Sequence, residues 1–107
     1  MKATVLSELG EKTYVLVFVS GDEVMAGLTA FAEREHMSAS HFTAIGALSD
    51  ATLGWFSWEE KRYRKIPIRE RVEVLSLAGD IVLDQKKPKV HAHIVLGKSD
   101  GTALLRK

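Results

Sequence analysis

The sequence predicts an α+β fold, a mainly antiparallel β-sheet of about seven strands with one packed amphipathic helix. Three observations support this prediction. Apolar and polar residues alternate with a period of two through most of the chain, as they do in β-strands. One early segment instead has the helical spacing of apolar residues and begins with helix-capping residues. The links between consecutive strands have the length of hairpin turns, which favours antiparallel neighbours and the α+β class.

Two strands are expected before the helix. The first covers residues 2–9 and ends at a turn formed by Gly10 and Glu11. The second covers residues 14–19, YVLVFV, which are apolar on both alternating faces and rich in β-branched side chains. That pattern predicts a central strand that is covered on both sides.

The helix is expected to begin after Ser20 and to run to about residue 36. Ser20 and Glu23 form a capping box, in which each side chain satisfies a backbone N–H at the helix start. Asp22 and Glu23 also suit the positive end of the helix dipole. The apolar stripe of this helix, which should pack on the sheet, consists of Val24, Leu28, Phe31 and Ala32.

Four further strands are expected at residues 41–48, 51–58, 62–68 and 70–83. Gly46 in the first of them predicts a bulge or a close backbone contact. Pro67 and the charged residues around it place the third strand at a sheet edge. The alternation of the fourth changes phase near Val74 and Leu75, and a bulge is the simplest cause.

A strand at residues 89–97, KVHAHIVLG, contains the most informative pattern in the chain. The strict alternation places His91, His93 and Val95 on one face of this strand. The two imidazoles therefore point the same way, with Cα atoms about 7 Å apart, close enough to reach one metal ion or one anionic ligand. A polar loop at residues 84–88 precedes this strand. An Asp-Gly hairpin turn at residues 98–101 and a last strand at residues 102–105 follow it.

Composition restricts the class of protein. The 107 residues form a single domain, residues 1–107, with 46% hydrophobic and 27% charged residues, as in ordinary soluble proteins. The absence of cysteine excludes disulfides, iron–sulfur clusters and thiolate zinc sites. No signal peptide or membrane span is recognisable, so a cytoplasmic protein without membrane contact is expected. The net charge of +1 gives no global attraction to nucleic acid.

The order of several motifs resembles the PPC domain, the "plants and prokaryotes conserved" domain. The motifs are AIGALSDATLGWF (44–56), VEVLSLAGDIVL (72–83) and HAHIVLG (91–97), placed after the helix and before an Asp-Gly turn. This domain is found alone in bacteria and archaea and beside AT-hooks in plant DNA-binding proteins. The resemblance covers residues 13–101. It implies an antiparallel sheet with a packed helix, a homotrimer, and a His-x-His strand that belongs to a candidate metal site in prokaryotic relatives.

Two departures from the family pattern limit what the resemblance implies. Family members usually continue after the Asp-Gly turn with a Gly-Gly-His-Leu segment and a further strand, whereas residues 102–107 here read TALLRK. We therefore expect the C-terminal family segment and its third histidine to be absent. The sequence also contains no AT-hook, so the DNA binding that plant relatives owe largely to that hook does not transfer to this chain.

His91 and His93 are the candidate metal ligands. Neutral imidazole suits a divalent metal, zinc above all, and an open zinc site needs a third protein ligand. His41, His36 or a neighbouring subunit would supply it. The alternative without function is two surface histidines on a strand. A cupin also carries His-x-His on a strand, but the position of its usual carboxylate is Gly97 here, and cupins lack an early capped helix.

Two functions are compatible with the histidine pair. The first is a binding or regulatory module, associated with DNA, that holds a divalent metal or a small anion. The second is a small metal-dependent hydrolase that uses a metal-bound water at His91 and His93. No general base or nucleophile stands out in the sequence, so the first function is favoured and no catalytic residue is nominated.

A basic segment next to aromatic residues is the candidate nucleic-acid contact. Its cationic residues are Lys61, Arg62, Arg64 and Lys65. Such residues contact phosphates, and nearby aromatic rings stack on bases. The favoured alternative is a solvated edge hairpin whose charges prevent edge-to-edge pairing, since neighbouring glutamates dilute the patch.

Trp55, Phe56 and Trp58 are the candidate interface residues. One helix cannot cover both faces of a sheet, so large aromatic side chains on that sheet predict burial against another subunit. This prediction agrees with the homotrimer that the resemblance implies. Burial in the core of the same chain is the alternative.

Overall fold

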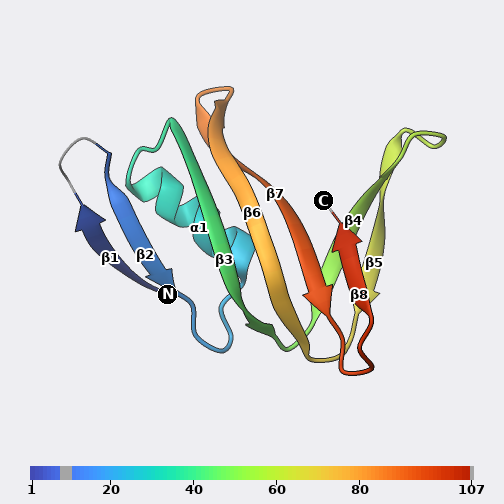
Figure 1. Ribbon diagram of the computed structural model, residues 1–107. Coiled ribbons are helices and arrows are strands. Elements are labelled where there is room, and N and C mark those ends of the chain that lie inside the picture. Colours follow the sequence, from blue (N-terminus) through green and yellow to red (C-terminus); the bar gives the residue numbers. More distant parts are fainter. Residues whose placement is uncertain (8–10, 107) are drawn as a thin grey trace.

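Figure 1 shows the computed structural model, which describes residues 1–7 and 11–106. The elements are β1 (Lys2–Ser7), β2 (Thr13–Val17), α1 (Val24–Arg34), β3 (Ala39–Leu48), β4 (Ala51–Ser57), β5 (Arg62–Ile68), β6 (Val72–Asp84), β7 (Lys87–Gly97) and β8 (Ala103–Arg106). All strand pairs among the described residues are antiparallel. The predicted α+β class is therefore confirmed. The last two residues of the first predicted strand lie outside the described residues.

The strands form one four-stranded sheet and two separate hairpins rather than one continuous sheet. The large sheet has the order β3-β6-β7-β8, and β1-β2 and β4-β5 pair only with each other. The two hairpins lie on opposite sides of the large sheet (Figure 1). The tip of the β4-β5 hairpin projects away from the helix and the other elements, at the upper right of Figure 1.

Helix α1 packs with its predicted stripe. Leu28, Phe31 and Ala32 are buried, and the helix contacts β7 on one face of the large sheet. The predicted capping box is wrong, because Glu23 itself is the N-cap and its carboxylate accepts the backbone N–H of Ala26. The helix ends at Arg34, two residues earlier than predicted, and His36 follows with a left-handed φ of 53°.

The core lies where the helix-side face of the large sheet continues toward the base of the β4-β5 hairpin. Its buried residues are Leu53, Ile68, Val72, Val74, Leu77 and Leu96. The predicted bulge in β6 places Val74 and Leu77 on this same face. The β6-β7 register shifts between Val74 and Ser76, and the β3-β6 register shifts between Ala44 and Gly46. Both predicted bulges are therefore present, and Leu75 is left exposed.

Two local predictions are wrong. Strand β2 is not central, because it pairs only with β1, and Val15 and Val17 remain 42% and 52% exposed. The one described helix contacts β2 on a single face, where the rings of Tyr14 and Phe31 lie 5.0 Å apart, and the Val15 and Val17 face stays exposed. The loop predicted at residues 84–88 is a two-residue turn at Gln85 and Lys86, both with positive φ, so β7 begins at Lys87.

The one helix within the described residues has 11 residues and is too short to cross a membrane.

Candidate functional site

The histidine strand β7 lies inside the four-stranded sheet, between β6 and β8. Asp80 of β6 lies directly opposite His41 of β3 on one side and His91 of β7 on the other. Ala78 in the same way lies between Thr43 and His93. Directly opposed residues project to the same face of a sheet. His41, Asp80, His91 and His93 therefore share one face.

That face is the one that helix α1 does not cover. Successive residues of a strand project to opposite faces, so Ile81 projects to the face opposite Asp80. Ile81 is buried on the core side and only 4% exposed. The four site residues are all exposed. We call this surface, defined by His41, Asp80, His91 and His93, the open sheet face.

His91 and His93 lie against each other. Their ring centroids are 5.3 Å apart and the ring planes are nearly perpendicular, at 85°. The pair therefore projects side by side, and one small ligand could contact both rings. Both residues lie within β7 rather than in a loop, and β6 pairs with the strand at both positions. Strand β8 pairs only with residues 94–97 of β7, beyond the two histidines.

The other histidines occupy different places. His41 shares the row of Asp80 and His91, but its Cα lies two strand spacings from that of His91, about 10 Å away. His36 lies in a shallow hollow of about 370 Å³ between the helix end and the β6-β7 turn. Within residues 1–7 and 11–106, no group of three His, Asp, Glu or Cys is close enough to hold a metal ion.

Asp80 is the residue that sequence reasoning missed. Residue 80 falls within the strand predicted at residues 70–83, but the sequence did not identify its neighbours, which the structure shows to be two histidines. A carboxylate in this position can orient an imidazole. The signal that would have identified it is the two-residue turn, because counting four residues back from each side of that turn pairs Asp80 with His91.

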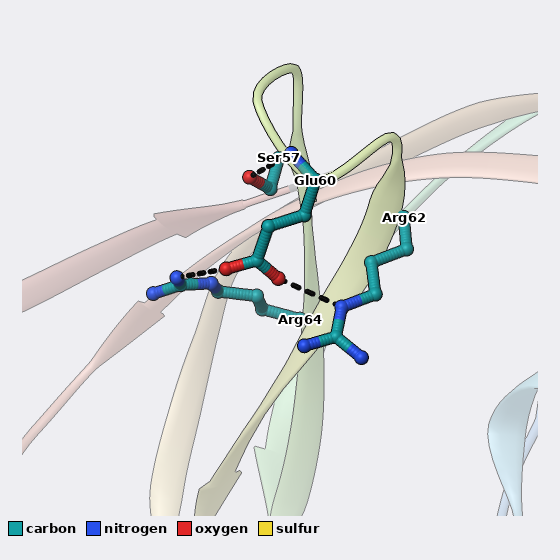
Figure 2. Close-up of polar contacts among 4 residues, drawn as sticks. All are labelled: Ser57, Glu60, Arg62 and Arg64. Atoms are coloured by element: carbon teal, nitrogen blue, oxygen red, sulfur yellow. Dashed lines mark hydrogen bonds and ion pairs between the residues drawn. The ribbon is translucent and has the colours of Figure 1, made fainter.

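The predicted basic segment forms the tip and outer strand of the β4-β5 hairpin. Figure 2 shows Glu60 bridging two of its cations: the Glu60 carboxylate accepts from Arg62 Nε at 2.7 Å and from an Arg64 Nη at 2.5 Å. The Ser57 hydroxyl accepts the backbone N–H of Glu60 at 3.3 Å. Hydrogen bonds from Arg64, and then from Arg62, lower the pKa of the Glu60 carboxyl below its ordinary value. Among the described residues, Lys61 and Lys65 form no ion pair.

The aromatic residues lie on the same hairpin and not on the open sheet face. Phe56 makes edge-to-face contacts with Trp58 and Tyr63, at centroid distances of 5.1 and 5.2 Å. Trp55 lies under the Arg64 guanidinium, 5.8 Å from its carbon to the ring centroid. The predicted interface residues and the predicted histidine site therefore belong to two separate surfaces.

Solved structures with the same fold include three from different organisms. A candidate DNA-binding protein from Bacteroides thetaiotaomicron is 28% identical with a TM-score of 0.86, over 97% of this chain and 71% of that chain. The PPC protein of Pyrococcus horikoshii is 30% identical with a TM-score of 0.79, over 83% and 62% of the two chains. A metal-containing protein from Archaeoglobus fulgidus is 28% identical with a TM-score of 0.77, over 100% and 70%.

A search of curated protein sequences found no match. The sequence profile of the Plants and Prokaryotes Conserved (PCC) domain, also abbreviated PPC, matches residues 6–105, nearly the whole chain. The motif order, the antiparallel sheet with one packed helix and this profile agree. The chain belongs to the Plants and Prokaryotes Conserved domain family.

Proposed function

We propose that this chain is a DNA-associated binding module that assembles as a homotrimer and holds a divalent metal or a small anion through His91 and His93. The observation that carries the proposal is the placement of the two imidazoles side by side on the open sheet face, 5.3 Å apart. Asp80 and His41 lie in the adjoining row of the same face.

Zinc is the metal that these residues suit best. Two imidazoles from one strand are two of the three protein ligands of an open zinc site, and a carboxylate beside a ligating histidine fixes the orientation of its ring. The described part of one chain does not complete the set. A neighbouring copy would bring the remaining ligand. The metal-containing relative from Archaeoglobus fulgidus has the same fold.

Exposed apolar residues on the large sheet support assembly. Ile45 of β3 is 84% exposed. Leu75 and Val82 are also exposed, although they belong to β6, which has a paired strand on each side. Large apolar side chains without a cover are typical of surfaces between subunits. The homotrimer is the assembly that the family resemblance implies.

Association with DNA is supported by the relatives rather than by the charge of the chain. The proteins from Bacteroides thetaiotaomicron and Ralstonia eutropha, which share this fold, are both candidate DNA-binding proteins. The net charge of +1 means that any contact with DNA depends on a local patch.

The test is metal analysis of protein purified without an affinity tag, together with zinc titration of the stripped protein. We expect bound metal in the wild type, its loss in His93→Ala, and its retention in His36→Ala, a matched histidine away from the open sheet face. If metal is absent and His93→Ala changes neither zinc binding nor phosphate binding, the histidine site is wrong.

One observation favours a second function, the small metal-dependent hydrolase. Asp80 lies opposite His91 and would be the proton acceptor that such a reaction needs. A screen of simple esters and phosphate esters with and without a chelator tests it. Chelator-sensitive turnover that is lost in both His93→Ala and Asp80→Asn would establish the hydrolase over the binding module.

A further inference from the structure

The β4-β5 hairpin concentrates positive charge. Residues 51–68 contain four Lys or Arg and two Glu, a net charge of +2, whereas the whole chain has +1. The remainder of the chain is therefore net negative. The cationic residues are exposed, and the tip of the hairpin projects from the rest of the molecule (Figure 1). This local excess of positive charge makes the hairpin the part of the chain that would attract an anionic partner.

One face of the hairpin carries an aromatic platform, defined by Phe56, Trp58 and Tyr63. Phe56 lies between the other two rings and contacts both edge-to-face. Trp58 and Tyr63 are 76% and 58% exposed, unusually open for large rings. Phe56 already restricts the Trp58 and Tyr63 rings through these contacts. The two side chains therefore lose little conformational entropy when a flat ligand stacks on their exposed side.

A lysine stands beside this platform. Lys65 lies opposite Gly54, one row along the same face from the Phe56–Tyr63 pair. Gly54 has no side chain to crowd that row. The separation of the two rows along the strand is about 7 Å. Lys61 lies in the turn at the tip of the hairpin. The aromatic rings therefore lie close to two lysines that form no ion pair within the part of the chain that the structure describes.

On the other face of the hairpin, the arginines are paired with a glutamate. Glu60 forms ion pairs with Arg62 and Arg64 (Figure 2). The Arg64 guanidinium also lies over the Trp55 ring. A phosphate that approaches these arginines must compete with the Glu60 carboxylate. Glu60 therefore weakens binding of anions at the arginines while Lys61 and Lys65 remain available.

We propose that the β4-β5 hairpin binds single-stranded nucleic acid, with bases stacked on Trp58 and Tyr63 and phosphates held by Lys61 and Lys65. Exposed ring faces select unpaired bases, because the bases of a duplex are already stacked on each other. The inference rests on the DNA-associated role proposed above and names its contact surface. It is independent of the histidine site.

Fluorescence and anisotropy with a labelled oligo-dT strand of about 12 nucleotides test the proposal, compared with a duplex of the same length. Both tryptophans of the chain, Trp55 and Trp58, belong to the hairpin region, so quenching of their emission reports contact there. We expect oligo-dT to bind more tightly than the duplex, with quenching. The logarithm of its affinity should fall with the logarithm of salt concentration by about 0.7 for each phosphate contacted.

Three variants locate the contact. Trp58→Leu should weaken oligo-dT binding by about 5- to 150-fold, the range for loss of one stacked base. Lys65→Gln should reduce the salt slope by about 0.7, whereas the matched control Lys86→Gln, an exposed lysine in the β6-β7 turn, should not change it. Light scattering should show that Trp58→Leu keeps the oligomeric state of the wild type.

Each contrary result has a distinct meaning. If duplex and single strand bind alike and Trp58→Leu has no effect, DNA association stands and the hairpin proposal is overturned. If neither DNA binds at about 50 mM salt, both the hairpin proposal and the DNA-associated role fail. If Trp58→Leu dissociates the oligomer, the aromatic platform is a subunit interface and the proposal is also overturned.

Discussion

The open sheet face and the β4-β5 hairpin position their side chains in different ways. His91 and His93 belong to a strand that pairs with β6 at both positions, and buried residues such as Leu96 lie on its reverse face. The hairpin residues are held by their own neighbours, Phe56 under the aromatic rings and Glu60 between two arginines. The first surface depends on the core of the domain, and the second depends on a few local contacts.

This difference predicts which substitutions should affect the histidines and which should affect the hairpin. A change in the core should disturb the histidines through the backbone of β6 and β7, and its cost is a global loss of stability. A change at the exposed tip should alter ligand binding with little effect on folding. Substitutions in the two regions should therefore separate stability from binding.

Leu96→Ala should have the largest effect. Leu96 is fully buried in the core cluster, on the strand that carries His91 and His93. Truncation leaves a cavity, and we expect the free energy of unfolding to fall by about 2–5 kcal/mol. Urea unfolding measures this change. The matched control Leu83→Ala removes a side chain that is 51% exposed and should change stability by less than about 0.5 kcal/mol. Equal losses in both variants would contradict the assigned core.

Gly79→Ala should have the next largest effect and tests the coupling of the core to the open sheet face. A Cβ at this position would lie 2.2 Å from the carbonyl oxygen of His91 and 2.9 Å from a ring carbon of Phe42. Because the first neighbour is backbone, β7 must shift to make room. We expect a loss of about 1–3 kcal/mol in the free energy of unfolding and weaker zinc binding.

A variant with Ala at position 79 that keeps both wild-type stability and zinc affinity would show that β6 and β7 are less closely packed than described. The substitution Ala47→Ser, at an exposed position of β3, serves as the control for a small change in the same sheet.

Much of the large sheet could be predicted because its signals are local. Alternation alone placed His91 and His93 on one face, and the change of phase at Val74 and Leu75 predicted the bulge. The apolar stripe of the helix likewise predicted Leu28, Phe31 and Ala32 as buried. In each case the pattern lies within one element and needs no knowledge of its neighbours.

The features that were missed depend on partners elsewhere in the chain. The apolar pattern of β2 predicted a strand covered on both faces, but the only described helix contacts β2 on one face, where the Tyr14 ring packs on Phe31. The partners of Asp80 depend on the register of β6 and β7, which the turn at Gln85 and Lys86 determines. Gln-Lys is not one of the residue pairs typical of a two-residue hairpin turn, so the sequence favoured a longer loop.

Asp80→Asn should have a moderate effect that is confined to the open sheet face. Asn has nearly the same shape but no charge, so the orienting effect of the carboxylate on His91 and His41 is lost. We expect zinc affinity to fall by about tenfold, as for other residues that orient metal ligands. Isothermal titration of the stripped protein measures it.

The control for Asp80→Asn is Asp84→Asn, which breaks the ion pair with Lys89 at 3.5 Å but lies at the far end of β6. Zinc affinity should not change in this variant. If the two substitutions have the same effect, general loss of negative charge explains the result and Asp80 has no specific role.

Glu60→Gln should have the smallest effect on the folded domain and the opposite sign for binding at the hairpin. The substitution frees Arg62 and Arg64, so oligo-dT affinity should rise several-fold while the midpoint of urea unfolding stays close to that of the wild type.

The pH dependence of Glu60→Gln follows from the sign of the pKa shift. The pKa of Glu60 is lowered in the folded chain, so its ion pairs stabilise the hairpin above the ordinary pKa of a glutamate and are lost as pH falls through the lowered value. Wild-type oligo-dT affinity should therefore rise in that acidic range, because protonation of Glu60 releases the arginines. Glu60→Gln should lack this part of the rise. Identical pH profiles for the two proteins would mean that Glu60 does not restrain the hairpin cations.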